Sequence, residues 1–77
     1  MATLDEVLAA RRDLPAPVVR RALRRGAKVS LAQVADEIGV TAEAVRLWEL
    51  GRREPRAVHL PEYVRVLELL APLAGRK

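Results

Sequence analysis

Arginine carries most of the chemistry that this sequence offers. The 77 residues include twelve arginines and only two lysines, and the formal net charge is +4. A guanidinium is planar and always charged, and it can donate two parallel hydrogen bonds to a phosphate or to the edge of a guanine. An excess of such groups favours a polyanionic partner, nucleic acid before an anionic membrane surface. Because asparagine and phenylalanine are absent and isoleucine occurs once, part of this excess reflects a GC-rich genome.

Other kinds of chemistry find little support in the residues. Cysteine is absent and His59 is the only histidine, so we expect no disulfide and no metal site. Asp36 and Glu37 are adjacent and diverge on a helix, and no nucleophile–base pair or glycine-rich phosphate loop is present. We therefore expect no enzymatic activity, no cofactor and no small-molecule substrate.

The sequence also argues against a membrane partner. Its apolar runs are far shorter than the ~20 residues that span a bilayer. The acidic N-terminus lacks the basic start of a signal peptide. We therefore expect a cytoplasmic protein that has no membrane partner.

Helical periodicity accounts for almost the whole chain. Apolar residues recur at helical spacing and strand-like alternation is missing, which predicts an all-α fold of about five helices in a single domain, residues 1–77. The predicted helices are 4–13, 17–25, 31–38, 42–50 and 60–70. Caps are expected from Thr3, Ser30 and Thr41, and terminators from Gly26, Gly39 and Gly51.

The domain divides into three parts. Residues 1–16 are a helix and a proline-containing linker, residues 17–70 form the core, and residues 71–77 are a tail that Ala71-Pro72 separates from the last helix. In the second helix, hydrophobicity predicts a core face of Val19, Ala22 and Leu23. The same reasoning predicts a solvent face of Arg20, Arg21, Arg24 and Arg25.

Residues 30–55 contain two short predicted helices on either side of a tight turn. Ala35 is small where the second of these helices must come close to the first, and Gly39 tolerates the positive φ that a tight turn requires. Val40 can fill the core from inside the turn, and Val45 can pack beneath it. This is the sequence pattern of a helix-turn-helix.

The segment resembles the lambda-type repressor and Cro family, also called the xenobiotic-response-element family of helix-turn-helix proteins. The resemblance covers about residues 18–70 and leaves out the first helix. The matching residues are Ala35, Gly39-Val40-Thr41, Val45, Trp48-Glu49, Gly51-Arg52-Arg53 and Pro55. The resemblance implies a lambda repressor-like bundle that binds double-stranded DNA sequence-specifically and regulates transcription, as a repressor or Cro-like protein of a bacterium or phage. It also implies a homodimer on two-fold sites, with half-sites roughly 34 Å apart.

In that family, the helix after the turn enters the major groove, and its early outward residues meet base edges. Carried over by position, these residues are Ala42, Glu43, Arg46 and Leu47. Arg46 can donate two hydrogen bonds to a guanine, Glu43 can accept one from a cytosine amine, and Leu47 or Ala42 can touch a thymine methyl. Alternatively, Arg46 is a solvated residue that pairs with Glu43 or Glu49 one helical turn away.

Phosphate contacts are expected on both sides of this helix. The residues that we assign to them are Arg24, Lys28, Ser30, Thr41, Arg52, Arg53 and Arg56. Trp48 is expected in the core, and Glu49 is expected to tie the helix end to the arginine loop that follows. Leu31 stands where many members of the family carry a glutamine that bridges phosphate and recognition helix. Either backbone N–H groups hold that phosphate alone, or the docking shifts.

Two other functions remain open. The domain can be a protein-interaction module with weak DNA affinity, such as an antitoxin or an adaptor that binds polymerase or a repressor. It can also bind RNA through the arginine-rich residues 20–28. Salt dependence distinguishes the first alternative from DNA binding, because phosphate binding weakens steeply with salt and an apolar protein interface does not.

A dimer contact is expected from residues 66–73 or from the first helix. The expected location is the bacterial or phage-infected cytoplasm, at the nucleoid.

Overall fold

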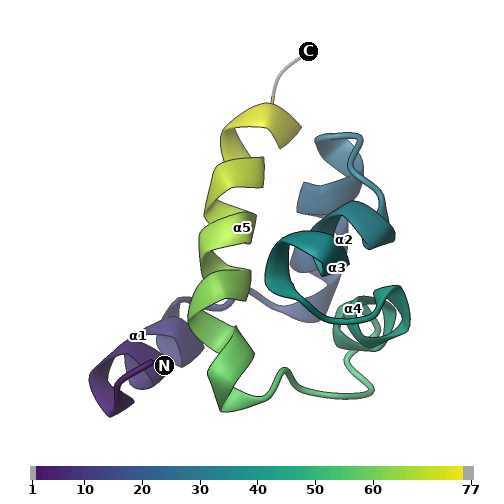
Figure 1. Ribbon diagram of the computed structural model, residues 1–77. Coiled ribbons are helices and arrows are strands. Elements are labelled where there is room, and N and C mark those ends of the chain that lie inside the picture. The colour runs from purple at the N-terminus through teal and green to yellow at the C-terminus, as the bar shows by residue number, and fades with distance from the viewer. Residues whose placement is uncertain (1, 76–77) are drawn as a thin grey trace.

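The computed structural model describes residues 2–75, and every regular element in that range is helical. The elements are α1 (Leu4–Asp13), α2 (Pro17–Gly26), α3 (Leu31–Ile38), α4 (Ala42–Glu49), a 3-10 turn η1 (Ala57–His59) and α5 (Leu60–Ala74). The long helix α5 stands against α2 and α3, α1 lies near the N-terminal end of α5, and a long loop leads from α4 back to α5 (Figure 1). The predicted all-α fold of about five helices is confirmed.

Side-chain caps begin three of the helices, as predicted. The hydroxyl oxygens of Thr3, Ser30 and Thr41 each accept a hydrogen bond from the backbone N–H three residues further on, at 3.0–3.2 Å. At Ser30, the side chain of Gln33 also accepts from the backbone N–H of the cap residue at 2.8 Å, which completes a capping box. These bonds satisfy N–H groups that the first helical turn leaves free, so they fix where α1, α3 and α4 begin.

The turn between α3 and α4 depends on one glycine conformation. Gly39 has φ 88° and ψ 35°, in the left-handed region. The N–H groups of Gly39 and Val40 both donate to the carbonyl of Ala35, at 2.8 and 3.0 Å. A Cβ at Gly39 would meet nothing within 4 Å, so the turn requires glycine for its backbone angle and not for space.

The contact between α2 and α5 corrects two predictions. Gly26 is not a left-handed terminator: the positive φ lies at Lys28 (60°), and Gly26 is the last residue of α2. A Cβ at Gly26 would lie 3.0 Å from the Cβ of Ala74, so glycine lets the ends of the two helices meet. α5 accordingly does not stop before Pro72 but continues to Ala74. This packing offsets the hydrogen bond that proline cannot donate. Residues 76–77 of the predicted tail lie outside the described residues.

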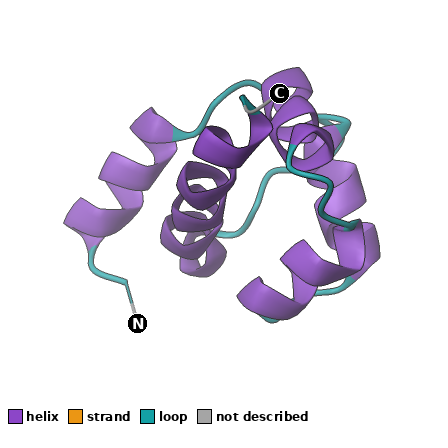
Figure 2. Cartoon of the chain, turned by 90° about the horizontal axis from the view of Figure 1, so that it is seen from above, coloured by secondary structure: helices purple, strands orange, loops and turns teal. Residues whose placement is uncertain are grey.

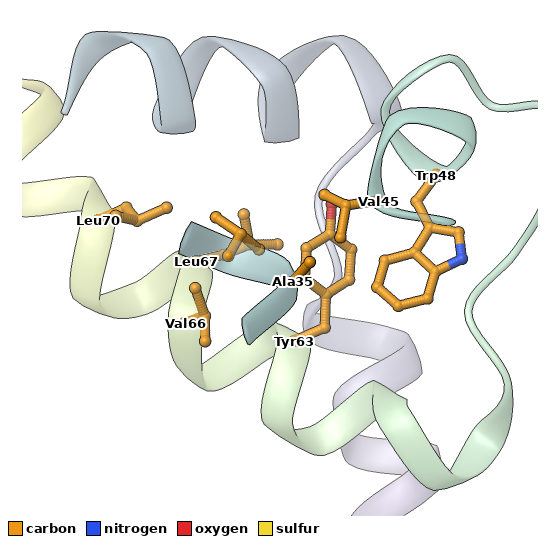
Figure 3. Packing of buried hydrophobic residues seen from close by; sticks show 8 residues of the cluster. Ala35, Val45, Trp48, Tyr63, Val66, Leu67 and Leu70 are labelled. Atoms are coloured by element: carbon orange, nitrogen blue, oxygen red, sulfur yellow. The ribbon is translucent and has the colours of Figure 1, made fainter. Parts of the chain in front are cut away.

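The main core lies where α3, α4 and α5 meet. Its buried residues are Val34, Ala35, Val45, Trp48, Tyr63, Val66, Leu67 and Leu70. The rings of Trp48 and Tyr63 pack with centroids 4.8 Å apart and an interplanar angle of 49°. Figure 3 shows the Tyr63 hydroxyl pointing toward Val45. Its oxygen is buried and has no hydrogen-bond partner within residues 2–75.

A smaller cluster holds α1. Ala10 is buried against Leu60 and Val64 of α5, with Val7 and Leu14 packed around them. Seen from above, α1 lies at one side of the bundle, and a short linker carries the chain from it to α2 (Figure 2). α1 is therefore an addition to one side of α5 and not part of the helix-turn-helix.

Candidate nucleic-acid interface

α4 is anchored on one side and exposed on the other. Val45 and Trp48 are 0% and 3% exposed, which confirms that they belong to the core. On the outer side, the side chains of Glu43 and Arg46 are 61% and 49% exposed. Ala42 and Leu47, the other two predicted base-contacting residues, are half-buried, and Ala42 packs against the core. Glu43 and Arg46 are therefore the side chains of this set that project furthest from the helix.

Glu43 and Arg46 form a two-bond ion pair on the exposed face of α4. The Nε of Arg46 donates to Oε1 of Glu43 at 2.7 Å, and Nη2 donates to Oε2 at 2.6 Å. The hydrogen bond from Arg46 lowers the pKa of Glu43, and the carboxylate raises that of Arg46. Both groups are thus charged at neutral pH. The Nη1 hydrogens and one Nη2 hydrogen of Arg46 stay free of this pair.

Glu49 also makes an ion pair, but a buried one. Its two oxygens accept from Nε and Nη2 of Arg24 at 2.6 and 3.0 Å, and Nη1 of Arg24 donates to the carbonyl of Val29 at 2.9 Å. The two side chains are 5% and 13% exposed. We predicted that Glu49 ties the end of α4 to the arginine loop, but its partner in the structure is Arg24 of α2. Arg24, which we predicted on DNA phosphate, has all three guanidinium nitrogens bonded inside the molecule.

Arg20 is the clearest error of the sequence-based prediction, because it faces inward and is 4% exposed. Its Nε donates to the carbonyl of Pro15 at 2.7 Å and its Nη1 to the carbonyl of Trp48 at 3.0 Å, while Glu54 lies 4.0 Å from its Nη2. The carbonyl of Trp48 lies in the last turn of α4 and also accepts from the backbone N–H of Gly51 at 3.2 Å, so Arg20 shares an acceptor that closes the helix. Arg20 thus joins the linker after α1 to the end of α4.

The spacing along α2 gives the reason for this error. Val19 and Ala22, predicted in the core, are exposed. The inner stripe consists instead of positions 20, 23, 24 and 27, which follow the i, i+3, i+4, i+7 rule. Leu23 and Ala27 pack against the core. Because Arg20 and Arg24 share this spacing, it was the signal in the sequence that both arginines point inward.

A groove of about 220 Å³ lies between the end of α2, the start of α3 and the outer side of α4. It is lined by Arg21, Arg24, Leu31, Arg46, Glu49 and Leu50. Leu31, which replaces the phosphate-bridging glutamine, thus contributes an apolar wall. Two exposed cations, Arg21 and Arg46, are among the lining residues. The groove opens beside the ion pair on α4, on the face where the base-contacting residues were predicted.

The loop after α4 carries three more of the predicted phosphate-contacting residues. Arg52, Arg53 and Arg56 are exposed, and within the described part of the chain no carboxylate lies within 4.0 Å of them. Gly51 begins this loop with φ 72°, and Pro55 is buried within it. A positive backbone angle and a buried proline therefore shape the loop, while its guanidinium groups stay available to an external anion.

Over residues 2–75, no three acidic or histidine side chains come together in a way that could hold a metal ion. No helix in that range has the length and apolar character needed to cross a membrane.

The fold and the exposed second helix of the motif define a helix-turn-helix protein. The family model described as "Helix-turn-helix" matches residues 21–70, about two thirds of the chain. The protein therefore belongs to the helix-turn-helix family of the lambda repressor/Cro type, and it is a DNA-binding transcription regulator. This is a family of DNA-binding regulators and not of enzymes. Comparisons with curated proteins and with solved structures return no match.

Proposed function

We propose that this regulator recognises its DNA site by placing α4 in the major groove, and that it acts as a repressor or a Cro-like protein. The observation that carries the proposal is the division of α4 into two sides. Val45 and Trp48 are buried and hold the helix, while Glu43 and Arg46 project outward. A helix that presents polar side chains on a rigid support is what major-groove reading requires.

Phosphate-binding groups flank this helix in the proposed complex. Ser30 and Thr41 accept cap hydrogen bonds through their oxygens, so each hydroxyl keeps its own proton to donate to a phosphate. Lys28 lies before α3, and Arg52, Arg53 and Arg56 follow α4. We assign to Arg21 the phosphate contact that was predicted for Arg24, because Arg21 is exposed at the groove, whereas Arg24 is paired with Glu49.

A homodimer on a two-fold site completes the proposal. Leu69 and Leu73 of α5 are exposed and four residues apart, so they lie on one face of the helix. This face falls within residues 66–73 and is a suitable contact between two copies. We place the protein in the cytoplasm of a bacterium or of a phage-infected cell, at the nucleoid.

The test is selection of bound duplexes from a random DNA pool, with wild type and Arg46→Ala in parallel. We expect an inverted repeat for the wild type, and weakened or altered preference at one base pair of each half-site for the variant. Removing one good bidentate contact relaxes discrimination by ~1–3 kcal/mol. Retention of DNA without any consensus, equal for both proteins and abolished by salt, would contradict major-groove reading.

A second candidate function rests on α1. Leu4 and Leu8 of this helix are exposed, and α1 lies outside the matched family segment. This favours a protein partner, as an antitoxin or an adaptor that binds polymerase or a repressor would have. Binding to such a partner would persist at high salt and would be lost in Leu4→Ser/Leu8→Ser, whereas DNA binding would respond to salt and keep its affinity in that variant.

A further inference from the structure

The geometry of the Glu43–Arg46 pair determines which edge of the guanidinium is available. Glu43 binds the side made by Nε and Nη2. The opposite edge, made by Nη1 and the second hydrogen of Nη2, carries two parallel donors. Two parallel donors match the O6 and N7 acceptors of a guanine in the major groove. The ion pair and a guanine contact therefore use different hydrogens of Arg46 and are compatible with each other.

Of the two carboxylates on α4, Glu43 and Glu49, Glu43 is the one that can hold Arg46. Glu49, one turn further along α4, lines the same groove. Its two oxygens are already bound to Arg24, and its side chain is 5% exposed. Glu43 lies in the first turn of α4, where the helix dipole favours a negative charge. The carboxylate thus lies one turn before Arg46 on the exposed face of α4, and both of its oxygens accept hydrogen bonds from that guanidinium.

We propose that Glu43 is not itself a base-reading residue but a positioning residue, which orients Arg46 so that its free edge meets a guanine. This inference rests on the proposed function. Glu43 makes the site more selective in two ways. It fixes one rotamer of Arg46 before binding, and its negative charge lowers affinity for any phosphate backbone that the protein meets without a matching base.

Removing the charge of Glu43 should therefore have two opposite effects. Ordering a long side chain at an interface weakens binding by about 2- to 13-fold, so Glu43→Gln should lose roughly that much preference for guanine at the base pair that Arg46 reads. Affinity for random-sequence duplex should rise in the same variant, because one acid fewer faces the phosphates. A residue with only a structural role would move both affinities in the same direction.

The experiment measures dissociation constants of the full chain for the selected duplex, for the three duplexes substituted at the Arg46 base pair, and for random duplex. The variants are Glu43→Gln, Arg46→Ala and their combination. The control is Glu62→Gln, which breaks a similar exposed pair, with Arg65 on α5. We expect the double variant to show the base preference of Arg46→Ala alone, and the control to match the wild type.

Two results would overturn the inference while leaving the proposed function intact. If Glu43→Gln changes preference at a second base pair, Glu43 reads a base itself. If Glu43→Gln keeps full preference for guanine, it does not position Arg46. If the wild type selects no consensus, the proposed function fails first and the inference fails with it.

Discussion

The buried pair between Arg24 and Glu49 gives a strong prediction for stability. Glu49→Gln keeps the shape of the side chain but leaves the Arg24 guanidinium buried without its counter-charge. Breaking a buried pair by removing one partner costs about 3–5 kcal/mol. A domain of 77 residues has a free energy of unfolding of about 4–12 kcal/mol. Loss of this one carboxylate should therefore remove a large part of the total stability.

The assay is urea unfolding followed by the fluorescence of Trp48, the single tryptophan, which is 3% exposed in the folded protein. A small domain loses about 1–3 kcal/mol of stability per molar urea, so the midpoint should fall by about 1 M or more. The double variant Arg24→Met/Glu49→Leu should recover most of the loss, because it removes both charges of the pair and leaves neither one unpaired. Glu43→Gln is the control, since its pair is exposed and its midpoint should hardly change.

The reasoning is refuted if Glu49→Gln costs less than about 1 kcal/mol, which is the size of an ordinary exposed pair. It is also refuted if the apolar double variant is as unstable as Glu49→Gln. That result would mean that the loss comes from the shape of the site and not from an unpaired charge.

Three further predictions concern the core, the surface and the turn. Burial raises the pKa of Tyr63 above its ordinary 10.0, so the folded state holds the phenol proton more tightly than the unfolded state and stability falls as pH rises above about 10. Tyr63→Phe should be at least as stable as the wild type at pH 7 and should lose less at alkaline pH; a deficit above ~1 kcal/mol at pH 7 would show that the hydroxyl is hydrogen-bonded. The hydrogen bond from Arg65 lowers the pKa of Glu62 below 4.5, so the stability that its carboxylate contributes is present above that pH and lost as pH falls further. The urea midpoint of Glu62→Gln should therefore depend less steeply on pH between about 5 and 3 than that of the wild type, and parallel curves would contradict this. Gly39→Ala should cost about 1–2 kcal/mol in the same urea assay, because φ 88° is strained for any residue with a Cβ; an unchanged midpoint would mean that the turn adapts.

Local sequence signals were sufficient to predict most of the architecture. Capping hydroxyls, the glycine of the turn and helical spacing predicted α1 and α3 with the bounds that the structure has, and α4 to within one residue. The burial of Val45 and Trp48 followed from the same spacing. These features depend on interactions within a few residues, which is why a sequence alone contains them.

Contacts between helices were harder to predict. Arg20 and Arg24 were assigned to solvent because arginine is rarely buried without a partner, and the partners on α4, Trp48 and Glu49, lie 28 and 25 residues away. The end of α5 was missed for a related reason, since the packing of Ala74 on Gly26 overrides the local effect of Pro72. The sequence allows a Glu43–Arg46 pair, but its side-on geometry depends on the rotamers of both side chains and follows only from the structure.

The two carbonyls that Arg20 binds bear on where this domain begins. The matched family segment starts at residue 21, one position after the side chain that donates to the end of α4. A fragment cut to the family boundary would lose that donor, together with the linker carbonyl that holds it in place. The smallest unit that keeps these bonds to the end of α4 is therefore longer than the family segment and includes the linker from Pro15 onward. Any fusion, truncation or domain graft made from this protein should be cut before that residue.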